Sequence, residues 1–278
     1  MKLESAVRTA AAAIAGARRL VITAGAGMGV DSGLPDFRSP QGFWKAYPPY
    51  KQLGIDFVGA ANPAHFEQDP AFAWGFYGHR TNLYRETVPH AGFHILRELI
   101  TCLSLSAFVV TSNVDGQFQK AGFDEEEILE VHGSIHHLQC SVPCSRSIWE
   151  NREQIPVNMD TMRAERIPRC IRCRAVARPN ILMFGDWSWI SDRSDRQRQR
   201  FDKFIGANVT SIVVVELGAG TAIPTIRNLG EQLGRRYGAK VIRINPREAE
   251  IDPPHVSLAL GALDGLRKIA AVPDLSRK

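Results

Sequence analysis

The sequence predicts an α/β fold: a doubly wound parallel sheet with helices on both faces, interrupted by a smaller inserted module that is helical and rich in cysteine. Short apolar runs lie at residues 20–23, 108–111, 128–131, 212–217 and 241–244. Helical patterns separate these runs, and continuously apolar strands alternating with helices are typical of a parallel sheet buried on both sides. Two regions, near residues 40–88 and 135–177, break this alternation and are interpreted as the insertions.

Composition indicates an ordinary globular protein. The chain has 278 residues, of which 44% are hydrophobic and 23% charged, so it can bury a full core. A net charge of +5 does not favour a nucleic-acid partner. The densest basic run is interleaved with aspartates and is expected to be a solvated helix face; it comprises Arg193, Arg196, Arg198 and Arg200.

The N-terminal segment is predicted to be the first core helix. Apolar side chains recur at helical spacing there and lead directly into the first strand; they are Leu3, Val7, Ala11 and Ile14. No apolar run approaches the length that spans a bilayer, so no membrane partner and a cytoplasmic location are expected.

The two inserted regions are expected to pack together. The first is rich in proline and aromatic residues, and the second holds four of the five cysteines. Within the first, residues 71–85 are predicted to be helical, with Pro70 beginning the helix.

The cysteines predict a structural zinc site. Cys140 and Cys144 form one close pair, and Cys170 and Cys173 form the other. Two such pairs in a cytosolic chain favour thiolate ligands over disulfides, and four sulfurs close a tetrahedral shell. His136 and His137 are alternative ligands. Cys102 has no partner pattern and is expected to be a buried, weakly hydrophobic side chain.

Polar and glycine residues follow the predicted strands. Gly25 and Gly27 come after the first strand, where the backbone can approach a pyrophosphate and the amides of 25–27 can bind phosphate. Asn113 and Asp115 follow the second strand and His132 ends the third. Ligands gather beyond the carboxyl ends of parallel strands, so these side chains are expected to share a site.

Several motifs, in order along nearly the whole chain, resemble those of the sirtuins, the NAD-dependent protein deacylases. Gly25-Ala26-Gly27 followed by Ser32-Gly33-Leu34-Pro35-Asp36-Phe37-Arg38 is similar to the family's first signature. Thr111-Ser112-Asn113-Val114-Asp115, His132-Gly133, the four cysteines, Phe184-Gly185-Asp186 and Ile244-Asn245 resemble its later motifs.

The resemblance implies NAD and zinc as cofactors and an acyl-lysine protein or peptide as substrate. The acyl oxygen attacks the nicotinamide ribose, nicotinamide leaves, and deacylation proceeds through 2′-O-acyl-ADP-ribose. His132 is then the general base, and Asn113 and Asp115 hold the ribose and a water. The implied NAD-binding residues are Ala24, Gly25, Ala26, Gly27, Asp36, Phe37, Arg38, Ser112, Asn113, Asp115, Gly218, Ala219, Gly220, Thr221 and Asn245.

The resemblance also implies a substrate channel. Met183, Phe184, Gly185 and Asp186 would line it. Tyr77 and Arg80 resemble the Tyr-x-x-Arg pair of sirtuins that prefer succinyl- and malonyl-lysine, in which the guanidinium takes the acyl carboxylate. Ala219 and Gly220 depart from the family's Thr-Ser, so Thr221 or backbone amides must replace two hydroxyls.

These inferences predict a Rossmann-like NAD-binding domain made of residues 1–39, 89–134 and 178–278. Residues 40–88 and 135–177 form the smaller helical and zinc module. The predicted function is NAD-dependent deacylation of protein lysine, with acetyl and acidic acyl groups both open. One alternative is an NAD-consuming ADP-ribosyltransferase or NAD glycohydrolase, and a second is a non-catalytic NAD-sensing module.

Overall fold

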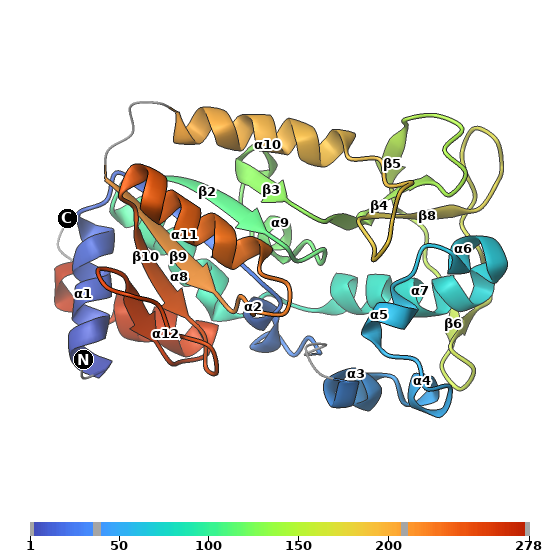
Figure 1. Cartoon of the computed structure of the whole chain (residues 1–278), viewed down its shortest axis with the longest axis horizontal. Helices are drawn as coiled ribbons and strands as arrows, with labels where there is room; N and C mark the ends of the chain where they lie inside the picture. Colours follow the sequence, from blue (N-terminus) through green and yellow to red (C-terminus); the bar gives the residue numbers. More distant parts are fainter. Residues whose placement is uncertain (1–2, 36–39, 207–210, 276–278) are drawn as a thin grey trace.

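The computed structural model describes residues 3–35, 40–206 and 211–275 (Figure 1). Its centre is a six-stranded parallel sheet in the order β11-β10-β9-β1-β2-β3. The strands are β1 (Arg19–Ala24), β2 (Ser106–Thr111), β3 (Ile128–Glu130), β9 (Ile212–Leu217), β10 (Lys240–Ile244) and β11 (Val256–Leu258). The predicted doubly wound sheet is confirmed, and β11 is a strand that the sequence did not predict.

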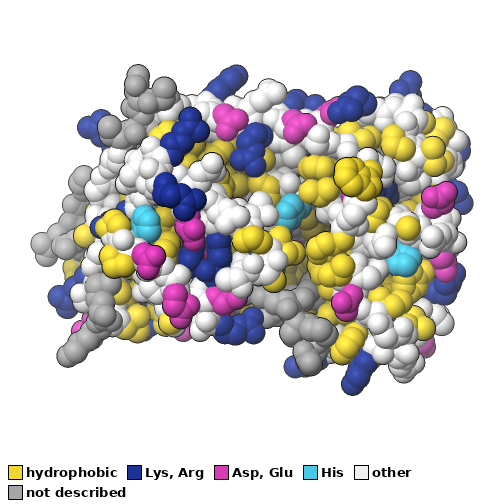
Figure 2. Space-filling model, in the orientation of Figure 1, with side chains coloured by type: hydrophobic (Ala, Val, Ile, Leu, Met, Phe, Trp, Pro, Cys, Tyr) yellow, Lys and Arg dark blue, Asp and Glu magenta, His cyan; other side chains and the backbone are white. Residues whose placement is uncertain are grey.

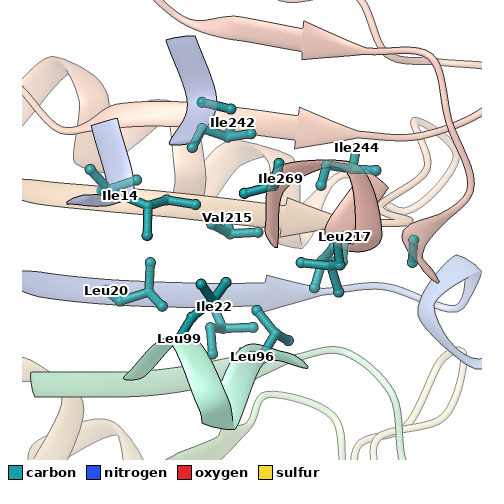
Figure 3. Packing of buried hydrophobic residues seen from close by; sticks show 14 of the residues in the cluster. Ile14, Leu20, Ile22, Leu96, Leu99, Val215, Leu217, Ile242, Ile244 and Ile269 are labelled. Carbon is teal, nitrogen blue, oxygen red and sulfur yellow. The ribbon is translucent and has the colours of Figure 1, made fainter. Parts of the chain in front are cut away.

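Helices cover both faces of this sheet. One face carries α1 (Leu3–Ala15), α8 (Ala91–Cys102) and α12 (Ala262–Ala270), and the other carries α10 (Asp192–Ile205) and α11 (Thr225–Tyr237). Along β1 the side chains alternate between the two layers, because Leu20 and Ile22 join the first apolar cluster and Val21 joins the second. Figure 3 shows Leu20 and Ile22 packed among Ile14, Leu96 and Val215.

The smaller module packs helices against a second, antiparallel sheet in the order β5-β4-β8. Its strands are β4 (Gly133–Cys140), β5 (Ile148–Glu150) and β8 (Ala177–Ile181), with a separate pair β6 (Val157–Asn158) and β7 (Arg163–Ala164). Its helices are α3 (Pro40–Ala46), α4 (Pro48–Gln52), α5 (Phe57–Ala60), α6 (His65–Gln68) and α7 (Pro70–Glu86). Short helices α2 (Gly27–Val30) and α9 (Gln117–Lys120) and 3₁₀ turns at Glu125–Glu127 and Pro273–Leu275 complete the described elements.

Helix α7 begins where proline chemistry predicts. Pro70 occupies the first turn, and the Asp69 side chain caps the helix by accepting a hydrogen bond from the Phe72 amide at 3.2 Å. The helix extends from the small module to the edge of the large sheet (Figure 1). Tyr77 and Arg80 therefore lie one helical turn apart near the junction of the two parts.

Two expectations about core residues were wrong. Leu3 is 44% exposed, because it begins α1 ahead of the turns that contact the sheet, whereas Val7, Ala11 and Ile14 are buried as predicted. Cys102 is exposed, because it ends α8 at the rim of the sheet. Among the described residues, none of the helices combines the length and apolar character needed to cross a membrane.

Candidate functional site

Two glycine loops meet at the carboxyl ends of β1 and β9. The Gly25 amide donates to the Leu217 carbonyl and the Gly27 amide to the Gly218 carbonyl, both at 3.0 Å. A Cβ on Gly25 would lie 2.8 Å from the Ala219 Cα, and one on Gly218 would lie 2.4 Å from the Gly27 carbonyl carbon. Side chains at these glycines would separate the loops. The Gly25 and Gly27 amides already donate within the protein. Phosphate binding by the amides of 25–27 stays a prediction.

Beside these loops lies a cavity of about 840 Å³, a volume suited to a large ligand. It spans the switch point of the sheet and the small module, and Gly25 and Ala26 line it from the first loop. The second loop contributes Ala219, Gly220, Thr221, Ala222 and Ile223. On the face drawn in Figure 2, apolar side chains gather toward the half that carries the small module, and basic side chains are interspersed with acidic ones.

The structure brings Asn113, Asp115 and His132 to the wall of this one cavity. The Asn113 amide is oriented by a hydrogen bond from its Nδ2 to the Gly25 carbonyl at 3.0 Å. Ser112 also lines the cavity, and its amide donates to the Ala24 carbonyl at 3.0 Å. Ala24 itself is the last residue of β1 and is buried.

Burial shifts the pKa values of both titratable groups in this set. It raises the pKa of Asp115 to about 6, an effect to which the nearby Glu130 charge adds, while a hydrogen bond from the Gln117 amide and the Arg80 charge oppose it. Burial lowers the pKa of His132, and a hydrogen bond to the Ser112 backbone partly offsets the decrease. The imidazole is therefore neutral near pH 7 and able to accept a proton.

In another part of the cavity wall, Glu248 connects two segments by hydrogen bonds to Thr221. Its Oε1 accepts a hydrogen bond from the Thr221 hydroxyl at 2.5 Å and its Oε2 accepts one from the Thr221 amide at 3.2 Å. Asn245 does not line the cavity; it is fully buried and its Nδ2 donates to the Ala219 carbonyl at 2.8 Å. Its Oδ1 accepts hydrogen bonds from the Arg247 and Glu248 amides, so Asn245 shapes this wall from behind.

A smaller cavity of about 330 Å³ lies on the other side of the glycine contact. Gly27 and Gly218 line it together with Asp31, Arg247 and Gly261. Arg247 lines both cavities. The predicted residues Gly27 and Gly218 thus belong to this second space rather than to the larger one.

Helix α7 supplies a cationic, aromatic wall through Tyr77, Arg80 and Tyr84. The guanidinium of Arg80 lies 5.0 Å from the centre of the Phe76 ring and 5.7 Å from that of Tyr77. Burial raises the pKa of the Tyr77 phenol to about 12, although the Arg80 charge opposes this, so the hydroxyl stays protonated. Tyr84 was not singled out from the sequence, although its spacing of four residues from Arg80 on a helix would have found it.

The segment after β8 divides between the cavity and the core. Met183 and Phe184 line the cavity with Ile181 and Leu182. Asp186 does not line it, because its carboxylate forms a fully buried ion pair with Arg178. Gly185 does not line the cavity either. Its φ of 66° allows the chain to turn between Phe184, which lines the cavity, and Asp186, which does not. Trp187 is entirely exposed.

The four predicted cysteines converge on one point. Their sulfur atoms all lie within 4.8 Å of one another, with 3.6 Å between Cys140 and Cys173 and 3.7 Å between Cys144 and Cys170. Zn–S bonds of about 2.3 Å give a tetrahedron whose edges are about 3.8 Å, so the cluster fits Zn²⁺. His136 and His137 are not in the cluster, and His136 Nε2 instead pairs with the Asp115 carbonyl at 2.9 Å.

Three predicted residues of the nicotinamide region, Asp36, Phe37 and Arg38, lie outside the described residues. The structure therefore leaves their predicted role as a prediction.

Comparison with known proteins gives a consistent result. The model of the Sir2 family matches residues 25–214. An NAD-dependent protein deacylase 1 of Pseudomonas aeruginosa is 30% identical over 251 residues, covering 89% of this chain and 91% of that protein. An NAD-dependent protein deacetylase of Saccharolobus solfataricus is 30% identical over 229 residues, covering 82% of this chain and 81% of that protein.

Solved structures share the fold. A Sir2 homologue in complex with NAD superposes with a TM-score of 0.74 at 24% identity, covering 95% of this chain and 92% of that one. A mutant Sir2 homologue in complex with ADP-ribose superposes with a TM-score of 0.69 at 25% identity, covering 94% and 93%.

Proposed function

Because the chain belongs to the Sir2 family, we propose that it is an NAD-dependent protein-lysine deacylase that releases nicotinamide and an O-acyl-ADP-ribose. The observation that carries the proposal is the convergence of Asn113, Asp115 and His132 on one cavity at the switch point of the sheet. Curated relatives of similar length are named for this activity. The acyl-lysine of a protein or peptide is the proposed substrate.

The cavity has the volume and lining that a dinucleotide needs. We place the nicotinamide ribose beside Asn113, Asp115 and His132, and the phosphates near Ala26, Ala219 and Gly220. The adenine half would enter the smaller cavity at Gly27 and Gly218, behind which Asn245 fixes the loop. When bound, NAD supplies a ribose carbon with a good leaving group.

The chain's own residues would then orient substrates and move one proton. Asn113, whose Nδ2 donates to the Gly25 carbonyl, would contact the ribose. The His132 imidazole, whose pKa is lowered by burial, would accept the proton of a ribose hydroxyl. Asp115 would hold the ribose and an attacking water, and the apolar side chains of Met183 and Phe184 would flank the acyl-lysine.

We also propose that the two packed parts have separate tasks. Residues 1–39, 89–134 and 178–278 would form the NAD-binding domain, since their apolar residues join the two clusters on the large sheet. Residues 40–88 and 135–177 would form the smaller module, whose apolar residues make up most of the third cluster. Four thiolates that hold zinc need a reducing compartment, which supports a cytoplasmic location.

Arg80 supports acidic acyl groups as a second class of substrate. It is only 6% exposed, lines the cavity, and places a cation among aromatic rings. A buried guanidinium beside a phenol can bind a carboxylate by charge-assisted hydrogen bonds. We propose that succinyl- and malonyl-lysine are accepted together with acetyl-lysine.

The test is incubation with NAD and either an acetyl-lysine or a succinyl-lysine peptide, followed by mass spectrometry. Deacylated peptide together with O-acyl-ADP-ribose would support the proposal. ADP-ribosylated protein would indicate a transferase, and peptide-independent release of nicotinamide a glycohydrolase. Absence of every product would favour the non-catalytic alternative.

A further inference from the structure

Trp187 is the most exposed large apolar residue in the described part of the chain. It is entirely exposed, so the indole, one of the largest apolar surfaces a residue can offer, stays in contact with water. Covering such a surface is favourable, and tryptophan is enriched among the residues that contribute most to protein interfaces. Single exposed apolar residues are common on proteins, so what matters is how Trp187 is held and what lies beside it.

The residue before Trp187 is anchored in the interior. The Asp186 carboxylate forms the buried ion pair with Arg178, and its Oδ1 accepts a hydrogen bond from Arg178 Nη1 at 3.0 Å. Its Oδ2 accepts a further bond from the Met183 amide at 3.3 Å, across the turn at Gly185. One buried carboxylate therefore fixes both ends of the turn that precedes Trp187.

The residue after Trp187 is anchored by the same carboxylate. The amide and the hydroxyl of Ser188 both donate to Asp186 Oδ1, at 3.0 and 3.2 Å. The Ser188 carbonyl accepts a bond from Nε2 of Gln139, a buried residue of β4, at 2.8 Å. Because both neighbours are fixed to the core, the backbone of Trp187 is held in one place while its side chain projects into solvent. A preformed anchor of this kind loses less entropy when it binds.

Trp187 lies close to the larger cavity. Phe184, three residues earlier, lines that cavity and is itself exposed, as is Leu182. The Phe184 amide donates to the Ala61 carbonyl at 3.4 Å, and its ring meets the Phe57 ring edge-on with 6.1 Å between the centres. Since three residues span at most about 11 Å of chain, Trp187 stands within that distance of the cavity lining.

Exposed apolar side chains reach this cavity from other segments too. Val58 on α5 and Ile223 in the loop after β9 are exposed and line it. The cavity thus combines the polar groups of Asn113, Asp115 and His132 with apolar side chains that remain partly open to solvent. A polypeptide that inserts one side chain into the cavity must pass over these exposed apolar residues.

We propose that Trp187 is a specificity-determining residue: it binds an apolar side chain of the substrate protein that lies within about three residues of the acyl-lysine. An extended chain advances about 3.3 Å per residue, so three residues cover the distance of at most about 11 Å between the cavity lining and Trp187. The place of the acyl-lysine is taken from the proposed function, on which this inference rests. The occupant is a polypeptide rather than a small ligand, because the indole stands outside the cavity on an exposed turn.

The experiment uses the full chain and dye-labelled acetyl-lysine peptides whose other positions are glycine and serine. In each peptide of the set one phenylalanine occupies one of the three positions on either side of the lysine, and the reference peptide has none. Fluorescence anisotropy without NAD measures the affinities. The parent should bind at least one phenylalanine peptide about 5- to 30-fold more tightly than the reference. Trp187→Ala should lose that preference and bind the reference peptide as the parent does.

Two further variants separate a direct contact from a structural effect. Trp187→Phe keeps an aromatic ring and should retain most of the preference. Val88→Ala is the control and should bind as the parent does, because Val88 is exposed and lines neither cavity. An equal loss of affinity for all peptides in Trp187→Ala, an undiminished preference in that variant, or no preference in the parent would overturn the proposal.

Turnover gives an independent measurement. In deacylation, the effect of Trp187→Ala should appear in KM for the phenylalanine peptides with kcat unchanged, because the indole contacts the substrate away from the reacting atoms. Phenylalanine-dependent binding in a protein that does not deacylate would leave this inference intact and contradict the proposed function. Deacylation of every peptide by the parent with the same KM would support the proposed function and overturn the inference.

Discussion

Arg80 and Tyr84 are joined by a forked contact: Nε and Nη2 of the guanidinium both donate to the same phenol oxygen, at 3.0 and 2.8 Å. Both residues line the larger cavity. A fork that holds one oxygen also has the geometry to take a carboxylate in its place. The guanidinium is thereby fixed in orientation before any ligand arrives, which reduces the entropy lost on binding.

Arg80→Met should therefore reduce desuccinylation much more than deacetylation. A hydrogen bond to a charged group contributes about 1.5 to 3 kcal/mol, so kcat/KM for a succinyl peptide should fall by roughly one to two orders of magnitude. Steady-state kinetics on paired acetyl and succinyl peptides measures the difference. Arg80→Lys keeps the charge but loses the forked geometry, so its kcat/KM for the succinyl peptide should lie between those of the parent and Arg80→Met. Equal losses for both peptides would make Arg80 structural.

His132→Ala should lose most deacylation while still binding NAD. General-base catalysis contributes about 10²- to 10⁴-fold, and the imidazole is one of many groups that line the cavity. Single-turnover rates and NAD titration by calorimetry report the two properties separately. His94→Ala is the control, since His94 is exposed on α8. Turnover that survives in a folded His132→Ala protein would remove this residue from the mechanism.

The cysteine cluster should hold about one equivalent of zinc, as a closed four-thiolate site requires. Strong chelation, or Cys144→Ser, should unfold the smaller module, because metal binding and folding are coupled. Elemental analysis and circular dichroism are the measurements. Cys102→Ser should change neither the zinc content nor the stability, since Cys102 is exposed and outside the cluster. A metal-free protein of unchanged stability would contradict the assignment.

Asp186→Ala should destabilise the fold by about 3 to 5 kcal/mol, because it leaves the Arg178 charge buried and unpaired. The Arg178 guanidinium and backbone amides hold the pKa of Asp186 below its ordinary value against the effect of burial. The pair's stabilisation is therefore present above the unfolded pKa of about 4 and is lost as pH falls through the lower folded pKa.

Urea denaturation at pH 7 and at lower pH measures this dependence. The free energy of unfolding of the parent should decrease as the pH falls. The difference in this free energy between parent and Asp186→Ala should therefore become smaller. Asp192→Ala, which removes an exposed ion pair with Arg146, should change stability little at either pH. A difference in free energy of unfolding that becomes larger at low pH would contradict a stabilising ion pair between Asp186 and Arg178.

The large sheet was predictable because its strands are largely apolar and helical patterns separate most of them, although β3 leads directly into β4 and β10 into β11. Strand β11 was not predicted because it is only three residues long and follows Pro253 and Pro254, which are typical of a loop. Cys102 was misjudged because residue type alone does not say which end of a helix reaches the rim of the sheet. The errors at β11 and Cys102 each concern a few residues in one place. The order of helices and strands, in contrast, is indicated by patterns that repeat along the chain.

The candidate site was only partly predictable. Asn113, Asp115 and His132 could be expected together because each follows a strand of the same sheet. The pairing of Thr221 with Glu248 could not, since it depends on a contact between residues far apart in the chain. Asp186 shows the same limit, because nothing in the local sequence says that its carboxylate turns inward to Arg178 rather than toward the cavity.

The contact between the glycine loops after β1 and β9 has a consequence for biosynthesis. Gly25 is made early and Ala219 late, with the whole smaller module translated between them. A nascent chain emerging from the ribosome therefore presents β1 with one side unpaired until β9 has been synthesised. The cavity cannot capture a dinucleotide before that moment, so the ligand can stabilise only a nearly finished chain and cannot template its early folding.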